Sequence, residues 1–244
     1  MIRKRVDTVM RAIKDLCFPP CCICCEKNLS ESQLLICDTC LDGLYFTEKP
    51  LCSKCGKVFG GRKGESHLCS SCMKSSLYYN RARSLFIYDD RIADLVHSLK
   101  YNCNTSGLET FTKLKRKSSS LEDLPRADLI FPVPLHIKRL RNRGYNQALL
   151  LARSFFDKEK NKIKNDILVR SRNTPPQTGL SGVERRKNLR NAFFVRDKKM
   201  VFGKHILLVD DVFTTGTTVN ECARVLIKAG ARNVDVLTLA RVRE

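Results

Sequence analysis

Residues 206–218 read Ile-Leu-Leu-Val-Asp-Asp-Val-Phe-Thr-Thr-Gly-Thr-Thr, and this stretch decides the fold of the 244-residue chain. Its apolar start predicts a buried strand, and a helical pattern over 218–229 follows it. Backbone N–H groups at a helix N-terminus, together with a glycine that permits close approach, suit a bound phosphate. The stretch therefore predicts a phosphate cradle at the carboxyl end of a strand, formed by Thr214, Thr215, Gly216, Thr217 and Thr218.

Two adjacent carboxylates, Asp210 and Asp211, lie beside this cradle. Their charge would repel a phosphate unless they had a further task. Accepting hydrogen bonds from the vicinal hydroxyls of a sugar that carries the phosphate is such a task. The alternative is an ordinary strand end at which Asp211 caps a turn. The complete string of residues 206–218 favours the sugar-phosphate interpretation.

Strands and helices alternate on both sides of this stretch. Apolar runs predict strands at 84–88, 129–133, 167–169 and 234–239, and helical spacing predicts helices over 92–99 and 145–156. Such alternation is typical of a parallel sheet covered by helices on both faces. Residues 80–244 are therefore predicted to form one α/β domain.

Two polar segments of this domain are rich in basic residues. Residues 132–147 follow a predicted strand, and residues 171–191 contain prolines and glycines that predict a long loop. A solvated basic face is the alternative for the arginines of the first segment. The lysine-rich runs at 113–117 and 158–164 are interpreted as solvated. The candidate binding residues are Arg139, Arg143, Asn146 and Gln147 in the first segment and Gln177, Arg185, Arg186 and Lys187 in the second.

Charge and cysteine are both distributed unevenly along the chain, whose formal net charge is +20. Residues 1–72 hold 11 basic and 8 acidic side chains, whereas the remainder holds 34 and 17, a net charge of +17. Eleven of the 13 cysteines lie in residues 17–72. We therefore predict an amphipathic helix at 1–16, a cysteine-rich module at 17–75 and a basic body whose charge favours polyanionic partners.

Four CxxC pairs occur in the cysteine-rich module. A CxxC turn directs two thiolates at one tetrahedral zinc ion, and a second turn completes the site. The sequence predicts two structural zinc sites, most simply paired in chain order, with cross-braced pairing left open. Cys21 and Cys24 have the same spacing as the first pair and remain alternative ligands. Free thiols or a redox or iron–sulfur role are the competing interpretations. The predicted ligands are Cys22, Cys25, Cys37, Cys40, Cys52, Cys55, Cys69 and Cys72.

The N-terminal residues do not predict export or membrane insertion. No run of about 20 apolar residues is present, and no apolar segment follows the basic residues 1–5. We expect a cytoplasmic protein without a membrane span. In that reducing compartment, clustered cysteines are more often metal ligands than disulfides.

Residues 206–218 closely resemble the PRPP-binding signature of type I phosphoribosyltransferases, where PRPP is phosphoribosyl pyrophosphate. Further segments resemble the ComF family over nearly the whole chain. Glu26 departs from the family pattern, because a glycine commonly follows this CxxC pair. The segments that carry the resemblance are 18–20 (Phe-Pro-Pro), 132–135 (Pro-Val-Pro-Leu), 138–147 (with Lys138-Arg139, Arg141 and Arg143-Gly144-Tyr145-Asn146-Gln147), 177–180 (Gln-Thr-Gly-Leu) and 185–188 (Arg-Arg-Lys-Asn).

The resemblance implies a type I phosphoribosyltransferase fold with an N-terminal double zinc ribbon, and PRPP with Mg²⁺ as ligand. By this resemblance Asp210 and Asp211 hold the ribose hydroxyls and the threonine-rich loop holds the 5′-phosphate. Residues 132–147 face the pyrophosphate and the acceptor, and residues 173–190 form a flexible loop that closes over the site. The resemblance also implies a role in DNA uptake and natural transformation, as an enzyme whose acceptor is not identified.

Two other functions remain open at this point. One is a single-stranded-DNA-binding competence factor, with a competence helicase-type protein as partner, which the charge of the body favours. Aromatic residues make up only 7% of the chain and tryptophan is absent, so few side chains are available to stack on bases. The other is a PRPP sensor without transferase turnover, since sensor and enzyme need the same loop. The oligomeric state is open as well.

Overall fold

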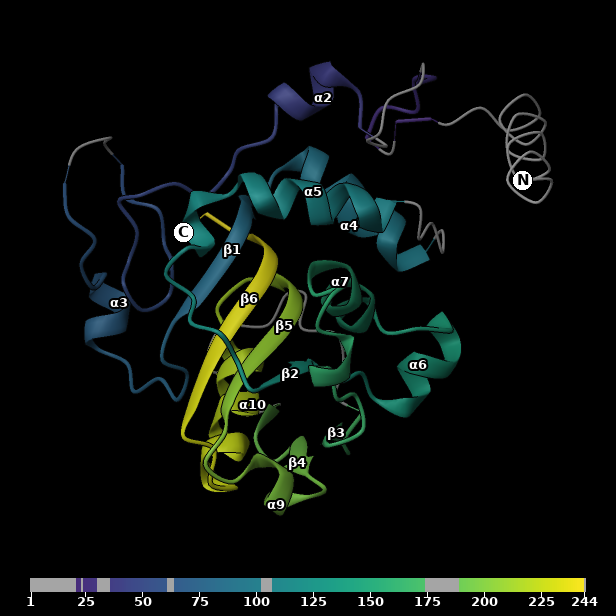
Figure 1. The fold of residues 1–244 in the computed structure, drawn as a ribbon. Helices are drawn as coiled ribbons and strands as arrows, with labels where there is room; N and C mark the ends of the chain where they lie inside the picture. The colour runs from purple at the N-terminus through teal and green to yellow at the C-terminus, as the bar shows by residue number, and fades with distance from the viewer. Residues whose placement is uncertain are drawn as a thin grey trace.

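The computed structural model describes residues 21–22, 24–29, 36–60, 64–101, 107–173 and 189–243. Its centre is a four-stranded parallel sheet in the order β1–β6–β5–β2 (Figure 1). The strands are β1 (Ala82–Ile87), β2 (Leu129–Pro132), β5 (His205–Phe213) and β6 (Asn233–Arg241). β1 and β6 are buried nearly throughout, as expected for strands covered on both faces.

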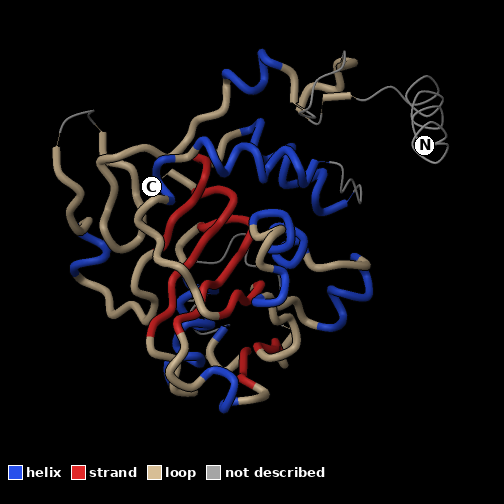
Figure 2. The backbone as a smooth tube through the Cα atoms, viewed as in Figure 1, coloured by secondary structure: helices blue, strands red, loops and turns tan. Residues whose placement is uncertain are grey.

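Helices cover both faces of this sheet, as the alternation of strands and helices predicts (Figure 2). Along β5, Ile206 and Leu208 pack into one core together with α10 (Thr217–Lys228). Leu207 and Val209 pack into a second core with α4 (Asp90–Tyr101), α5 (Gly107–Lys117) and α7 (Gln147–Phe155). Side chains alternate across a strand, so one apolar run supplies both cores. The predicted α/β fold class is confirmed.

The shorter elements differ from the sequence-based predictions. β3 (Leu168–Arg170) was expected to join the parallel sheet, but it pairs antiparallel with β4 (Phe193–Val195) in a separate two-stranded sheet. The basic segment 132–147 contains the helix α6 (Ile137–Arg143) rather than a continuous loop. The remaining short elements are α2 (Asp38–Asp42), α3 (Ser70–Met73), η1 (Ser119–Leu121), η2 (Lys160–Lys162) and α9 (Lys198–Val201).

Two helices also differ from the predictions, for identifiable reasons. Helix α5 was not predicted, because its lysine-rich end reads as a solvated run, yet Phe111 and Leu114 of this helix are fully buried. Helix α7 starts at Gln147 rather than at Tyr145, because the Asn146 side chain caps it. The lysine-rich run concealed the buried face of α5, whereas Asn146 is a local capping signal that apolar periodicity alone does not register.

The cysteine-rich module packs on the β1 side of the sheet. Cys22, Cys40 and Leu44 contribute to the core that contains α4, whereas Cys52 and Cys55 contribute to the core that contains α10. The two halves of the module thus extend the hydrophobic cores on opposite faces of the same sheet.

The segment between these halves, residues 45–47, lies along the edge of β1 that does not pair with β6. Tyr45 O accepts from Ile87 N at 2.8 Å, and Thr47 N donates to Leu85 O at 2.9 Å. Phe46 forms an antiparallel bridge with Phe86, and their rings are 4.8 Å apart. An uncovered edge strand is a template for unwanted pairing, so this segment protects the sheet as well as joining the two halves.

Within the described part of the chain, no helix combines the length and the apolar character that crossing a membrane requires. The predicted helix at 1–16 and most of the predicted loop at 171–191 lie outside the described residues. The proposed domain boundaries at residues 16, 75 and 80 remain predictions.

Candidate functional site

A polar cavity of about 340 Å³ lies at the carboxyl ends of β2 and β5. β2 ends where Pro132 faces Val209, while β5 continues to Phe213. The carboxylates Asp210 and Asp211 therefore project beyond the shorter strand, where ligands bind in open α/β sheets. The cavity is lined by these two residues and by Val133, Pro134, Leu135, Arg139, Arg143, Asn146, Gln147, Ala148, Arg170, Val212, Thr214 and Thr218.

The predicted phosphate loop joins β5 to α10 beside this cavity. Gly216 is the N-cap of α10 and has φ +71°, a left-handed conformation that favours glycine. Thr214 and Thr218 line the cavity, whereas Thr215 and Thr217 exchange a 2.8 Å hydroxyl hydrogen bond. The loop thus brings hydroxyls and the amino-terminal end of α10 to the cavity, which suits an anion.

The opposite wall comes from the basic segment. Arg139 and Arg143 stand one helical turn apart on α6 and both line the cavity, since residues four apart share a face. Arg141 lies between them in the sequence and is exposed. The helical conformation therefore separates two cavity arginines from one solvated arginine, a distinction that a predicted loop does not make.

Asn146 and Gln147 differ in what they contribute to the cavity wall. Asn146 Oδ1 accepts from Ala148 N, and its Nδ2 donates to Val133 O, both at 3.0 Å. It therefore ties the end of β2 to the start of α7. Gln147 is 3% exposed, and its Nε2 has no hydrogen-bond partner among the described residues. The two residues thus differ: Asn146 uses its side chain to join two elements, whereas the described residues offer no acceptor to Gln147 Nε2.

Arg170, at the end of β3, is a cavity residue that the sequence analysis missed. It is 7% exposed, and its guanidinium carbon lies 5.4 Å from the ring centroid of Phe193. Burial lowers the pKa of Arg170, and the charge of Arg139 adds to this effect, while Asp210 opposes it. An arginine directly after a short apolar strand was the available signal. That Arg170 lines the cavity follows only from the structure, in which β3 pairs with β4 and not with the main sheet.

The cavity therefore combines three guanidinium groups with two carboxylates. Cys222 lies fully buried nearby, and its pKa is raised by burial and by the charge of Asp210. That thiol therefore stays protonated. The predicted loop residues Gln177, Arg185, Arg186 and Lys187 lie outside the described residues.

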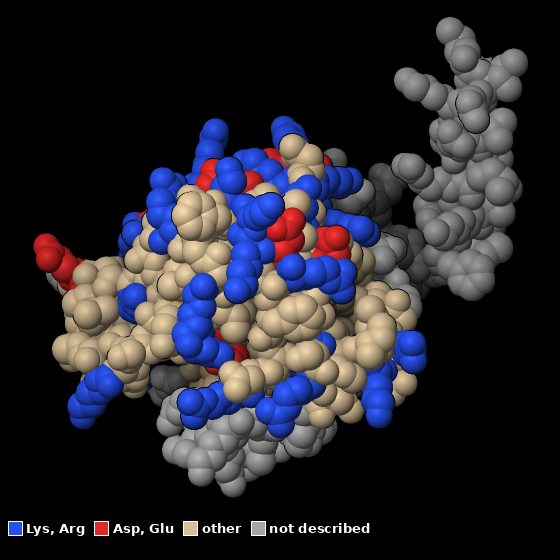
Figure 3. All heavy atoms as spheres, turned by 90° about the horizontal axis from the view of Figure 1, so that it is seen from below, with Lys and Arg blue, Asp and Glu red and all other residues tan. Residues whose placement is uncertain are grey.

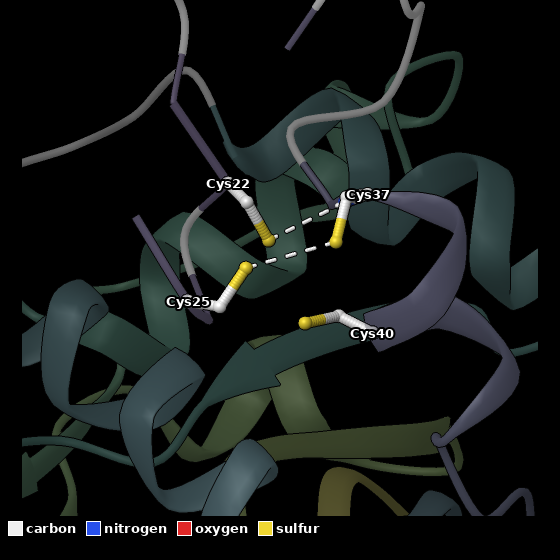
Figure 4. Close-up of side chains that lie close together, drawn as sticks. All are labelled: Cys22, Cys25, Cys37 and Cys40. Carbon is white, nitrogen blue, oxygen red and sulfur yellow. Dashed lines mark hydrogen bonds between the residues drawn. The ribbon is translucent and has the colours of Figure 1, made fainter. Parts of the chain in front are cut away.

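Cys22, Cys25, Cys37 and Cys40 form the first cysteine cluster, and their sulfur atoms point toward one centre (Figure 4). Cys25 Sγ and Cys37 Sγ are 3.7 Å apart. Burial raises the pKa of Cys22, but N–H donors of Cys37, Cys24 and Cys25 outweigh burial and lower it to about 6. The structure brings together the first two CxxC pairs and leaves Cys21 outside, where its Sγ contacts Asn28 Oδ1 at 3.2 Å.

Cys52, Cys55, Cys69 and Cys72 form the second cluster, which is buried more deeply. Cys55 Sγ and Cys69 Sγ are 3.8 Å apart. The pKa of Cys52 is raised by burial and lowered more strongly by N–H donors of Cys55, Cys69 and Lys54, to about 6. The clusters thus pair their CxxC motifs in chain order, not in the cross-braced order.

Both clusters begin with the same backbone turn. In the first, Cys22 O accepts from Glu26 N at 2.8 Å, and in the second, Cys52 O accepts from Gly56 N at 2.9 Å. Gly56 has φ +73° and Glu26 has φ +58°. The position requires a left-handed backbone conformation. Glycine adopts this conformation without strain, whereas Glu26 is strained.

Two buried arginines attach the second cluster to the main sheet. Arg241, from β6, donates from Nη1 to Cys55 O at 2.6 Å, and Arg83, from β1, donates to Cys52 O at 3.5 Å. Arg83 also forms an ion pair with Asp123. Arg241 is 2% exposed. Burial raises the pKa of the Cys55 thiol to about 11, and the charge of Arg241 partly offsets this rise. The second cluster is therefore part of the core of the α/β domain.

The two clusters have the donor set and the geometry of structural zinc sites. In each cluster all four sulfurs lie within 4.8 Å of one another. A tetrahedral site with Zn–S bonds of about 2.3 Å places its sulfurs about 3.8 Å apart, close to the distances observed. Four protein thiolates fill a tetrahedral ion, so the chemistry these sites offer is structural.

The chain matches two known domains. Residues 13–74 match the double zinc ribbon domain, and residues 140–244 match the phosphoribosyl transferase domain. Both matches agree with the cysteine clusters and with the loop at the end of β5.

Curated relatives align with the chain over most of their length. The DNA utilization protein YhgH of Escherichia coli K12 is 32% identical over 93% of this chain and 99% of its own. Competence protein F of Haemophilus influenzae is 31% identical over 90% and 96%, and competence protein ComFC of Bacillus subtilis is 26% identical over 90% and 94%. The chain therefore belongs to the ComF family, which joins a double zinc ribbon to a phosphoribosyltransferase domain.

Proposed function

We propose that the chain binds PRPP with Mg²⁺ in the cavity at the end of β5 and acts as a phosphoribosyltransferase in DNA uptake and natural transformation. One observation carries the proposal. Two carboxylates, a threonine-rich loop at a helix N-terminus and three guanidinium groups line one cavity of about 340 Å³. PRPP presents the matching groups, namely vicinal hydroxyls, a 5′-phosphate and a pyrophosphate.

Each part of the cavity has a role in this proposal. Asp210 and Asp211 accept hydrogen bonds from the ribose hydroxyls, and the loop at Thr214–Thr218 donates to the 5′-phosphate. Arg139, Arg143 and Arg170 neutralise the departing pyrophosphate, whose charge grows as the bond to the anomeric carbon breaks. The carboxylates also stabilise the positive charge that develops on the ribose.

The carboxylate oxygens of Asp210 and Asp211 fit Mg²⁺, which prefers hard oxygen ligands together with substrate phosphates. Bound with PRPP, the ion would supply additional charge neutralisation of the pyrophosphate. The loop residues Gln177, Arg185, Arg186 and Lys187 are proposed to close over the site and exclude water.

Calorimetry with PRPP and Mg²⁺ tests the proposal. The double variant Asp210→Asn/Asp211→Asn is the matched probe. Asp210 Oδ1 accepts from Asp211 N, and Asp211 Oδ1 from Val212 N, so asparagine retains these local bonds while removing both charges. We expect binding heat for the wild type and none for the variant. Absence of binding by the wild type, or equal binding by both proteins, would refute the proposal.

Turnover is a separate measurement. Release of pyrophosphate in the presence of an acceptor identifies an enzyme, whereas PRPP binding without release in any acceptor mixture identifies a sensor. The relatives named for competence and DNA utilization support the biological setting, and a cytoplasmic location is part of the same proposal.

A second candidate function is binding of single-stranded DNA. Figure 3 shows Lys and Arg side chains spread over the lower face of the molecule, with few acidic groups between them. Phosphate contacts make affinity fall steeply with salt. A labelled oligonucleotide that shows no salt-dependent binding at low ionic strength would exclude this function. A helicase-type partner remains a prediction.

A further inference from the structure

A second cavity, of about 430 Å³, lies where the cysteine-rich module meets the main sheet. It opens at the carboxyl ends of β1 and β6, next to Ile87 and Arg241, and shares no lining residue with the cavity at the end of β5. Small-molecule sites are commonly of this size. We call it the ribbon cavity and define it by Tyr45, Phe46, Lys57, Phe59, Arg241 and Arg243.

Aromatic rings form one part of this cavity. Tyr45 is 55% exposed, and the guanidinium carbon of Arg243 lies 5.6 Å from its ring centroid. Phe59 is partly buried and stacks on His67, with the ring centroids 4.1 Å apart and the planes nearly parallel. Tyr45 beside a guanidinium group and Phe59 beside an imidazole both line the cavity and present stacking surfaces for another planar ring.

Cationic groups form the other part. Lys57 and the exposed Arg243 line the cavity, with Glu48 as the only acidic lining residue in the described chain. Arg241 lies buried at the base, where its Nη1 donates to Cys55 O. No described atom accepts a hydrogen bond from its Nη2. Three cations against one carboxylate favour an anionic ligand.

Phe213 lies between Arg241 of the ribbon cavity and Gly216 of the phosphate loop. Its ring centroid lies 5.5 Å from the guanidinium carbon of Arg241 on one side. On the other side, a Cβ added to Gly216 would meet its Cζ at 2.5 Å. Since the two cavities share no lining residue, a ligand in the ribbon cavity does not occupy the space beside Asp210 and Asp211.

We propose that the ribbon cavity binds a nucleotide, with its base stacked on Tyr45 and Phe59 and its phosphate near Lys57, Arg241 and Arg243. A free mononucleotide and one unit of a single strand present the same ring and the same phosphate. This inference goes beyond the proposed PRPP site and does not depend on it.

The test uses the full zinc-loaded chain and two probes, dTMP and an oligothymidylate of about 12 nucleotides. Affinities are measured for the wild type, for Tyr45→Ala and for Arg243→Ala. The matched controls are Tyr78→Ala and Arg196→Ala, which remove exposed side chains outside the cavity. All four side chains are solvent-exposed, so the variants are expected to fold, and their zinc content verifies this.

Loss of one stacking ring weakens binding about 5- to 150-fold, so Tyr45→Ala should weaken it by this factor while Tyr78→Ala leaves it unchanged. Binding of dTMP with the same sensitivity to Tyr45 supports a free nucleotide, and binding of the oligonucleotide alone supports a single strand. Saturating PRPP should not compete in either case.

Photo-crosslinking with an iodouracil-containing oligonucleotide gives an independent location. Crosslinks are expected in the peptides that contain Tyr45 or Phe59. The proposal is overturned if neither probe binds, if Tyr45→Ala and Tyr78→Ala behave alike, or if all crosslinks map elsewhere. Calorimetry with PRPP reports on the other cavity, so failure of one proposal does not imply failure of the other.

Discussion

The phosphate loop depends on a glycine whose replacement has a calculable cost. Gly216 and Gly203 both have φ +71°, so alanine at either position is strained by about 1–2 kcal/mol. At Gly203 the added Cβ meets nothing within 4 Å, whereas at Gly216 it meets Phe213 Cζ at 2.5 Å. Phe213 is buried against Tyr79 and Arg241, so its ring cannot move aside freely. Overpacking of this kind costs about 1–3 kcal/mol more.

We therefore expect Gly216→Ala to lower the free energy of unfolding by about 2–5 kcal/mol and Gly203→Ala by only about 1–2 kcal/mol. Denaturant unfolding of both variants measures the difference. If PRPP binds as proposed, Gly216→Ala should also weaken it, because the loop N–H groups move, while Gly203→Ala should not. Equal destabilisation by the two variants would show that Phe213 does not back the loop, and the reasoning would be wrong.

The remaining predictions concern the cysteine clusters and the walls of the cavity at the end of β5. Cys25→Ser and Cys52→Ser should each remove one of two zinc ions in metal analysis. Both variants should lower the unfolding free energy, because each loses a structural ion. Cys52→Ser should lower it by about 1–3 kcal/mol more, since it leaves a hydroxyl at a fully buried position whereas Cys25 is exposed; equal losses would contradict the integrated second site. Arg170→Met should weaken PRPP binding about 10- to 150-fold in calorimetry, as loss of a charge-assisted hydrogen bond does, and Arg170→Lys should recover part of it; unchanged affinity would remove Arg170 from the site. Asn146→Ala should cost about 0.5–2 kcal/mol in urea unfolding, and Asn146→Asp should cost less because the cap acceptor remains; the reverse order would show that the bond to Val133 dominates.

Local patterns were sufficient for the fold class and for the two kinds of binding element. A strand that is buried on both faces reads as a continuous apolar run, like the one before Asp210, and a covering helix reads as apolar residues at helical spacing. Both patterns are visible in the sequence. The CxxC pairs predict metal sites from local sequence alone, because two intervening residues allow both thiolates to bind one tetrahedral ion. The resemblance to the ComF family also marks the position of Glu26, where a glycine commonly stands and where the structure has φ +58°.

Contacts between distant segments decided the rest. The spacing of the cysteines allows sequential and cross-braced pairing alike, and only the folded chain brings Cys22 and Cys25 to Cys37 and Cys40. A short apolar run at 167–169 has the same pattern in a parallel and an antiparallel sheet, so Arg170 became a cavity residue only through the pairing of β3 with β4.

The sequence by itself determined the α/β domain, the cysteine-rich module and the loop that suits a phosphate, because each depends on neighbours within a few residues. The tertiary structure alone decided that Arg241 donates to Cys55 O and that Phe213 lies between Arg241 and the phosphate loop. Those arrangements join residues from opposite ends of the chain, and their energies come from burial and hydrogen bonds that exist only after the sheet has formed.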